Sequence, residues 1–253
     1  MPTVDATVLT SSTSFWMSVF DETPAEAGNH RSWTLRVSCE DMGVDELLAA
    51  GNPLVPSTDA RAVVLVEGVS DQVALEALAE RRGRHLDSEG VSVVPIGGAQ
   101  AIGRFLDRFG PQGLDVRLAG LCDAGEESDF RRGLERAGLG SHLTRVEMER
   151  LGFYVCVADL EDELIRALGA TSVEHVVDAQ GDLGSFRTLQ KQSPWQGRTT
   201  EEQLRRFMGS GARRKIRYAR LLVDALDLTR APRPLDLVLA HVGAAPYSVE
   251  LHR

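Results

Sequence analysis

The segment Ala62-Val-Val-Leu-Val-Glu-Gly-Val-Ser-Asp71 decides the fold. Its first five residues, 62–66, are apolar and mostly β-branched, which predicts a strand buried on both faces, as in a parallel sheet. Glu67 closes this strand, and a helical pattern follows at 70–82, so Asp71 falls on the first helical turn. The segment therefore predicts a β-α unit with two carboxylates where the strand passes into the helix.

The same alternation of apolar run and helical period continues to residue 168. Strands are predicted at 91–96, 116–121 and 153–157, with helices at 99–109, 126–137 and 160–168. Beyond residue 169 only helical stretches follow, at 172–179, 201–208, 212–226 and 235–242. This order predicts an α/β fold: a mostly parallel, Rossmann-like sheet flanked by helices, with a helical C-terminal extension.

Three regions follow from these patterns. Residues 1–60 read as an N-terminal appendage whose order the sequence leaves open. Residues 61–168 form the expected α/β core, and residues 169–253 form the helical extension, which carries a basic segment.

Composition and cysteine usage narrow the class of protein. A hydrophobic fraction of 43% and a charged fraction of 26% are typical of a globular protein. The three cysteines form no CxxC pair, and Cys122 and Cys156 lie in apolar runs, which favours core residues in a reducing compartment. With no leader pattern and no apolar run of about 18 residues, we expect a cytoplasmic protein without a membrane partner.

Charge is unevenly distributed along the chain. The net charge of −9 argues against a general basic coat for nucleic acid. Between Arg205 and Arg220, however, seven basic residues occur without an acidic one. This segment predicts a local contact with an anion, although an amphipathic helix with a solvated arginine face would give the same pattern.

Acidic residues follow three of the predicted strands. Glu67 ends the first strand, Asp123 ends the third, and Asp159 follows the fourth. The carboxyl ends of parallel strands line one crevice, where ligands bind in open α/β sheets. Carboxylates gathered there repel one another unless a cation lies between them, and oxygen ligands suit Mg²⁺ or Mn²⁺. Asp71, one turn away, could reach the same ion.

Structural roles compete with this interpretation. Asp71 would be favoured at a helix N-terminus by the helix dipole alone. Asp123 and Asp159 each precede another acidic residue by three positions, which is typical of helix capping. Glu67 has no capping role, and it is therefore the strongest single indication of a metal site.

The segment Val66-Glu67-Gly68-Val69-Ser70-Asp71 resembles a TOPRIM domain, and most of all the type found in OLD-family (overcoming lysogenization defect) endonucleases. In that superfamily a strand ends in a catalytic glutamate followed by glycine, and a later strand ends in Asp-x-Asp; both bind magnesium. Glu67 matches the glutamate, Asp71 matches an additional acidic position of OLD-type domains, and Gly97-Gly98 matches a later glycine pair. The resemblance spans about residues 61–243.

One departure from the family pattern concerns catalysis. Asp123 stands at the first position of Asp-x-Asp, but Gly125 replaces the second aspartate. Glu126 or Glu127 could substitute for it from a neighbouring position. The departure puts two-metal catalysis in doubt and leaves the first metal site intact.

The resemblance extends to two later motifs. The segment 158–164 resembles the acidic motif in which a glutamate contributes to a second metal, a role open to Glu161 or Glu163. Lys215 resembles the late lysine that such domains place near the scissile phosphate. The residues expected to contact nucleic acid are Arg213, Arg214 and Arg217.

The resemblance implies a Mg²⁺- or Mn²⁺-dependent endonuclease that acts on nucleic acid, with DNA as the expected form. The expected catalytic residues are Glu67, Asp123 and Lys215. The expected metal ligands are Glu67, Asp71, Asp123, Glu126, Glu161 and Glu163. A Gly-Lys-[Ser/Thr] Walker A loop, which OLD nucleases carry on a fused ATPase, is absent from the sequence, so an ATPase partner would be a separate chain. The sequence is also compatible with a homodimer.

Two other functions stay open. The first is a non-catalytic module that binds metal or nucleic acid through the same fold, which the glycine at 125 favours. The second is an unrelated phosphoryl-transfer enzyme with Asp123 as its nucleophile. The sequence favours this last function least, because the Asp-x-Asp-x-[Thr/Val] pattern expected around such a nucleophile is absent.

Overall fold

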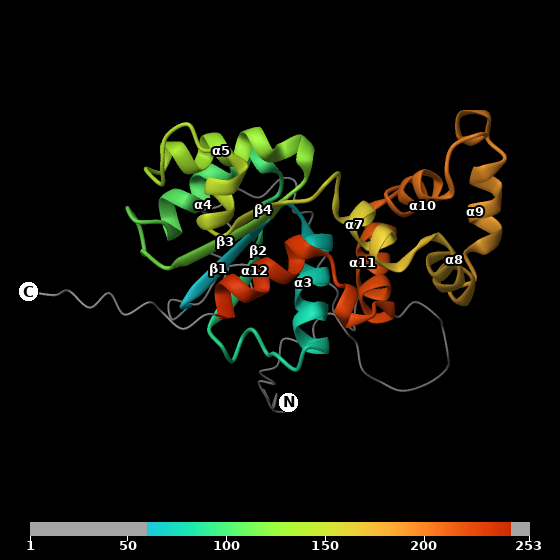
Figure 1. The fold of residues 1–253 in the computed structure, drawn as a ribbon, viewed down its shortest axis with the longest axis horizontal. Coiled ribbons are helices and arrows are strands. Elements are labelled where there is room, and N and C mark those ends of the chain that lie inside the picture. Colours follow the sequence, from blue (N-terminus) through green and yellow to red (C-terminus); the bar gives the residue numbers. More distant parts are fainter. Residues whose placement is uncertain (1–59, 244–253) are drawn as a thin grey trace, which may run out of the picture. The chain divides into compact units, whose positions relative to one another are not determined.

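A computed structural model describes residues 60–243 of the chain. Apart from its last residue, the predicted appendage at 1–60 lies outside the described residues. Within them, four strands form one parallel sheet in the order β2-β1-β3-β4 (Figure 1). The strands are β1 (Ala62–Val66), β2 (Val91–Pro95), β3 (Arg117–Cys122) and β4 (Phe153–Val155). The predicted parallel α/β sheet is confirmed.

The apolar run at 62–66 forms a central strand because both of its faces are covered. All five residues of β1 are at most 3% exposed. Val63 and Leu65 pack into one hydrophobic cluster, whereas Val64 and Val66 pack into a second cluster on the other face. A continuous β-branched run satisfies both faces at once, which an alternating pattern could not do.

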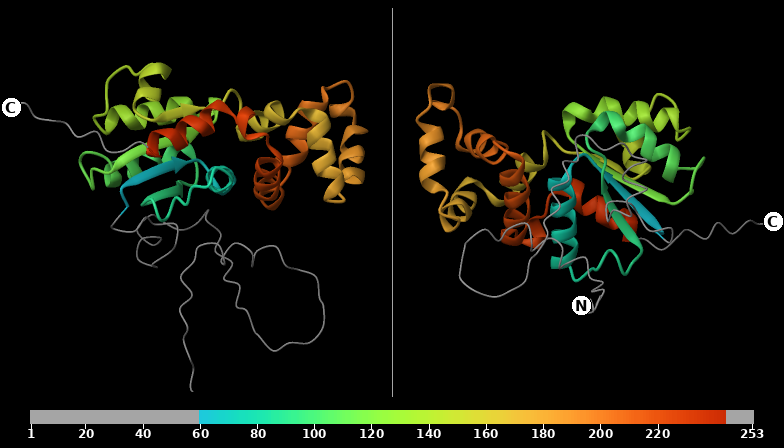
Figure 2. Two further views of the ribbon diagram at one scale, coloured as in Figure 1. Left: turned by 60° about the horizontal axis from the view of Figure 1, so that its bottom comes forward. Right: turned by 180° about the vertical axis from the view of Figure 1, so that it is seen from behind.

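Helices cover the two faces of the sheet (Figure 2). One face packs against α3 (Val69–Arg81) and α12 (Arg233–Gly243). The other packs against α4 (Ile102–Phe109), α5 (Glu127–Arg136) and α6 (Arg145–Arg150). Sequence patterns do not predict α6. It begins at a reciprocal cap, in which the Glu147 amide donates to Thr144 Oγ1 at 3.3 Å and the Thr144 amide donates to Glu147 Oε2 at 2.7 Å.

The remaining helices follow β4 in the chain. They are α7 (Leu160–Leu168), α8 (Ala170–Ala179), α9 (Leu183–Gln190), α10 (Thr200–Met208) and α11 (Ala212–Ala225). Helix α11 packs along α3 and also contacts α7. Edge-to-face contacts join Phe207 to Phe186 and to Tyr218, which forms an aromatic core for this region. The predicted helical stretches are confirmed, and α9 is an additional helix.

Short 3-10 turns connect several elements: η1 (Ala99–Ala101), η2 (Ala124–Glu126), η3 (Ser193–Trp195) and η4 (Leu228–Arg230). Cys122 and Cys156 are buried free thiols, as predicted. Helix α12, although it comes last, lies against β1, β3 and β4. No helix among residues 60–243 has the length and apolarity needed to cross a membrane.

Candidate metal centre

The β1–α3 connection presents Glu67 and Asp71. Gly68 is the N-cap of α3, and its amide donates to Asp71 Oδ2 at 3.1 Å, so the carboxylate closes the first helical turn. Asp71 is 5% exposed. The amide of Gly98 donates to the Glu67 carbonyl at 3.2 Å, which holds the glycine turn after β2 against the end of β1. The Glu67 side chain ends in a buried oxygen, Oε2, that has no hydrogen-bond partner.

Asp123 lies at the same edge of the sheet. Val66 of β1 pairs with Leu121 of β3, so the residues that follow these two strands emerge side by side. The amide of Ala124 donates to the carbonyl of Ala158 at 3.0 Å, which joins this turn to the one after β4. Asp123 makes no side-chain cap to the following 3-10 turn. Capping therefore does not account for Asp123.

The first turn of α7 brings a third element to this edge. Asp159 caps α7, because its Oδ1 accepts from the Asp162 amide at 2.9 Å; here the capping interpretation is confirmed. Glu161 is 5% exposed, and its Oε1 has no hydrogen-bond partner. Its other oxygen lies 3.5 Å from Lys215 Nζ, on α11. The structure thus brings Glu161 and Lys215 together from distant parts of the sequence.

The structure separates Glu161 from Glu163, between which the sequence could not choose. Glu163 Oε1 accepts from the Val157 amide at 2.7 Å, and Oε2 pairs with Arg166 at 2.9 Å. Its carboxylate is therefore occupied by local contacts on the other side of the α7 turn. Glu161, in contrast, faces the other carboxylates.

Glu126 and Glu127 differ in the same way. Glu127 pairs with Arg131 at 2.6 Å and also with Arg145. Glu126 makes no such pair within the described residues, and it raises the pKa of Glu67. Of the two candidates to replace the missing aspartate, Glu126 is the one near the cluster.

Burial and mutual repulsion raise the pKa of all four central carboxyl groups. Burial is the main cause at each, and repulsion by neighbouring carboxylates adds to it: Asp71 acts on Glu67, and Glu67 acts on Asp123. The pKa values are about 7 for Glu67, about 6 for Asp71, about 7 for Asp123 and about 7 for Glu161. We name Glu67, Asp71, Asp123 and Glu161 the carboxylate edge.

Lys215 is the cation that faces the carboxylate edge. Burial alone would lower the pKa of Lys215, but attraction to Glu161, Asp71 and Asp123 raises it above its ordinary value. The lysine therefore stays charged, and it opposes only one of four negative charges. Two buried carboxylate oxygens, on Glu67 and Glu161, still lack a partner.

This donor set fits a hard divalent cation. An all-oxygen set with unbalanced negative charge suits Mg²⁺ or Mn²⁺. Among residues 60–243, no three Asp, Glu, His or Cys side chains already stand close enough to hold one ion. Side-chain rotation toward the cation would have to complete the ligand set.

The arginines of the basic segment differ in whether they have a carboxylate partner. Arg217 pairs with Asp182 and is therefore occupied within the protein. Arg214 lies over the Phe207 ring, 4.3 Å from its centroid, and donates to Ser210 Oγ at 2.6 Å. Arg213 is exposed and makes no hydrogen bond or ion pair with any described residue. Of the three arginines expected to contact nucleic acid, Arg213 and Arg214 have no carboxylate partner among residues 60–243.

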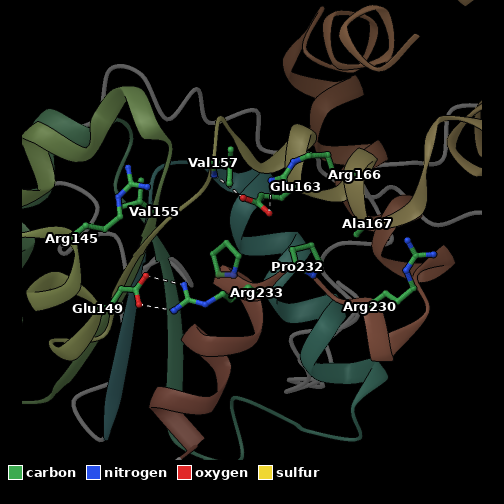
Figure 3. A pocket seen from close by; sticks show the side chains of 11 residues that line it. Arg145, Glu149, Val155, Val157, Glu163, Arg166, Ala167, Arg230, Pro232 and Arg233 are labelled. Atoms are coloured by element: carbon green, nitrogen blue, oxygen red, sulfur yellow. Dashed lines mark hydrogen bonds and ion pairs between the residues drawn. The ribbon is translucent and has the colours of Figure 1, made fainter. Parts of the chain in front are cut away.

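A second charged feature lies beside β4, on the far side of the α7 turn. It is a groove of about 430 Å³ lined by residues of β4, α6, α7, η4 and α12, and we name it the arginine groove (Figure 3). Arg233 donates two hydrogen bonds, of 2.7 and 2.9 Å, to the carboxylate of Glu149, and Arg166 forms an ion pair with Glu163. Both glutamates of the groove thus have an arginine partner, and Arg145 and Arg230 also line it, so the groove carries an excess of positive charge and does not resemble a metal centre.

Comparison with known proteins identifies the domain. Residues 60–124 match the family model for the TOPRIM domain of overcoming lysogenization defect protein-like proteins. No curated protein matches the sequence.

Among solved structures, the chain is similar to the C-terminal region of the Burkholderia pseudomallei OLD protein. The identity is 22% and the TM-score 0.56, over 72% of this chain and 97% of that one. The C-terminal region of the Xanthomonas campestris pv. campestris OLD protein matches with 23% identity and a TM-score of 0.55, over 72% and 94% of the two chains. The chain therefore has the fold of the C-terminal region of OLD proteins. Within it, residues 60–124 are a TOPRIM domain that resembles the one in OLD proteins.

Proposed function

We propose that the chain is a divalent-metal-dependent nuclease that cleaves phosphodiester bonds at the carboxylate edge. The observation that supports this most is the imbalance of charge. Four carboxyl groups with raised pKa values face one lysine, and two of their buried oxygens have no partner. Perturbed titratable groups gathered at the ligand-binding edge of a parallel sheet are typical of functional sites.

The carboxylates would divide between two ions. Glu67, Asp71 and Asp123 would hold one Mg²⁺ or Mn²⁺, and Glu161 with Glu126 would contribute to a second. Such ions polarise the phosphate and lower the pKa of the attacking water. Glu163 would take part only if it gave up its contacts with Val157 and Arg166; its role stays a prediction.

Lys215 and the arginines would act on the substrate. The Lys215 ammonium would stabilise negative charge on the phosphate or the leaving oxygen, because it already lies at the carboxylate edge and keeps its proton. Arg213 and Arg214 would contact the phosphate backbone without reading sequence. Arg217 could contribute only after releasing Asp182. DNA is the proposed substrate, the cytoplasm is the proposed compartment, and a separate ATPase chain is a proposed partner.

Metal-dependent cleavage tests the proposal. We expect wild-type protein to nick plasmid DNA or degrade oligonucleotides with Mg²⁺ or Mn²⁺ and to lose this activity in EDTA. Glu67→Gln and Asp123→Asn should each lower the rate by ~100-fold or more, since each removes a charged ligand. Glu201→Gln, at an exposed position on α10, is the matched control and should cleave normally. Equal cleavage by all four proteins would refute the proposed site.

A non-catalytic metal-binding module is the second candidate, and Gly125 is the observation that favours it. The glycine leaves the family's second aspartate position without a carboxylate. Mn²⁺ titration by calorimetry, set beside the cleavage assay, separates the two functions. Metal binding without cleavage of duplex DNA, single-stranded DNA or RNA would establish the module.

A further inference from the structure

Asp159 links two parts of the molecule through its two carboxylate oxygens. Oδ1 accepts from the Asp162 amide at 2.9 Å and so caps α7. Oδ2 accepts from Arg205 Nε, on α10, at 2.6 Å. Both oxygens are therefore engaged by nitrogen donors. Asp159 influences the carboxylate edge, since it raises the pKa of Asp123 and of Glu161, but it is not free to serve as a ligand in this arrangement.

The position of Glu161 depends on this link. Glu161 follows Asp159 by two residues on the same helical turn, and it is 5% exposed. Apart from the 3.5 Å contact with Lys215, its carboxylate has no ion pair among the described residues, and Oε1 has no hydrogen bond. No strong side-chain contact holds this carboxylate, so the backbone of the α7 turn determines where it points. That turn is capped by Asp159.

Helix α10 supplies the other half of the link. It packs against α7 (Figure 1). The Arg205 side chain reaches from α10 to the cap residue. No sequence signal predicts this pair, because the two residues are 46 positions apart. A residue that orients a ligand without touching the metal affects affinity nearly as strongly as some ligands do.

We propose that Arg205, acting through Asp159, is a positioning residue for the cation ligand Glu161. The ion pair holds the first turn of α7 so that Glu161 faces the other carboxylates, and it makes the metal centre depend on α10. This inference rests on the proposed function, because it takes Glu161 to be a ligand.

Simple electrostatics predicts a different outcome, which makes the inference testable. Removing the positive charge of Arg205 should tighten cation binding if the charge acts only through space, whereas removing the negative charge of Asp159 should weaken it. Positioning requires both changes to weaken binding. The effect of Arg205→Ala therefore has opposite signs under the two explanations.

The experiment measures Mn²⁺ affinity of the full chain by calorimetry, at the site that Glu161→Gln weakens. Asparagine caps helices as well as aspartate does, so Asp159→Asn removes the ion pair and keeps the cap. We expect Arg205→Ala and Asp159→Asn each to weaken Mn²⁺ by ~10-fold, and the double variant to be no worse than either. Arg205→Lys should recover affinity to within ~3-fold of wild type. Arg206→Ala, an exposed neighbour without a described partner, should bind normally.

Melting temperature shows whether a variant is folded. The Arg205 side chain is 46% exposed, so losing the ion pair should shift the melting temperature by no more than ~3 °C. Unchanged or tighter Mn²⁺ binding by Arg205→Ala would overturn the inference; if that variant unfolds, Arg205→Gln, which also removes the charge and the ion pair, decides in its place. Absence of Mn²⁺ binding in wild type would instead refute the proposed function, and the inference with it.

Discussion

The carboxylate edge and the arginine groove are both rich in charge, and they lie on opposite sides of one helical turn. Glu161 faces the first, and Glu163 faces the second. In the groove, Glu149 and Glu163 each have an arginine at ion-pair distance (Figure 3). At the edge, four carboxyl groups share Lys215 and have raised pKa values.

The two places therefore differ in the role of their carboxylates. In the groove the glutamates are paired with arginine, whereas at the edge the carboxylates lack enough cationic partners. A carboxylate paired with arginine keeps a low pKa, as Glu149 does, and gains little from an added cation. A buried carboxylate beside other carboxylates has a raised pKa and is stabilised strongly by one. The groove is lined by four arginines and two glutamates, whereas the edge carries an excess of carboxylates, and this excess favours the edge as the candidate metal centre.

The largest contrast should come from removing one cation at each place. Lys215→Met should lower cleavage by ~100- to 1,000-fold, because the substrate phosphate loses its stabilising ammonium. Arg233→Met, in the groove, should change the rate by less than ~2-fold. The measurement is the initial rate of DNA cleavage with saturating Mn²⁺. Comparable losses in both variants would mean that the groove takes part in the reaction and would break the comparison.

Adding charge at the edge should sharpen the comparison. A Cβ atom added at Gly125 would meet no atom within 4 Å, so the backbone there accepts Gly125→Asp, which places a carboxylate at the position where the family pattern has one. We expect Mn²⁺ affinity to rise by ~10-fold, since a hard ion gains one more charged oxygen ligand. Gly125→Asn has the same size without the charge, and calorimetry should show a smaller gain for it. Weaker Mn²⁺ binding by the aspartate variant would contradict the expectation.

Much of this arrangement could be predicted from sequence because it depends on local patterns. A β-branched run that ends in Glu67 predicts both a buried parallel strand and a carboxylate at its carboxyl end. Asp123 follows from the same rule at β3. The structure brings both to the edge, with Asp71 and Lys215. Their roles as ligands and catalytic groups stay predictions.

The rest depends on packing that local patterns do not encode. Glu161 and Glu163 are two positions apart on a helix, so they point in very different directions. Only the contacts of α7 with α11 and with Val157, after β4, decide which one faces the edge. The pairing of Arg217 with Asp182 likewise joins α11 to the N-cap residue of α9 across 35 positions. Helices α6 and α9 are not predicted from the sequence, because each is short and a short apolar pattern is a weak indication of a helix.

Acidification should affect the two places differently. The pKa of Glu67, Asp123 and Glu161 is about 7 in the folded protein, above the ordinary values of 4.5, 3.8 and 4.5. Between those values and 7 the folded state binds more protons than the unfolded state, so stability falls as pH rises through this window. The pKa of Glu149 is lowered, so its contribution is lost only below its ordinary value of 4.5.

In EDTA, the melting temperature should therefore be higher at about pH 5.5 than at about pH 7.5, by ~3 °C or more. Saturating Mn²⁺ should reverse this order, because the ion competes with protons for the same oxygens. Glu161→Gln removes one titrating group and should therefore reduce the pH dependence of the melting temperature. His241, whose pKa is lowered, has an opposing effect, but it is the same in the variant and in wild type and cancels in the comparison. An equal pH dependence in the variant and in wild type would exclude Glu161 as a source.

The smallest effects should still differ in sign. Glu149→Gln breaks an ion pair in which Arg233 is 66% exposed, so the free energy of unfolding should fall by no more than ~1 kcal/mol. Glu161→Gln removes a charge that burial destabilises and that Asp159 and Asp71 repel, although Lys215 attracts it, so without metal it should raise the free energy of unfolding at neutral pH by ~1 kcal/mol. Urea denaturation in EDTA measures both. A buried carboxylate whose removal stabilises the protein is retained for something other than stability, whereas one whose removal costs a little has only a structural role. If both substitutions destabilised the protein equally, the carboxylate edge would be an ordinary ion-pair network like the groove.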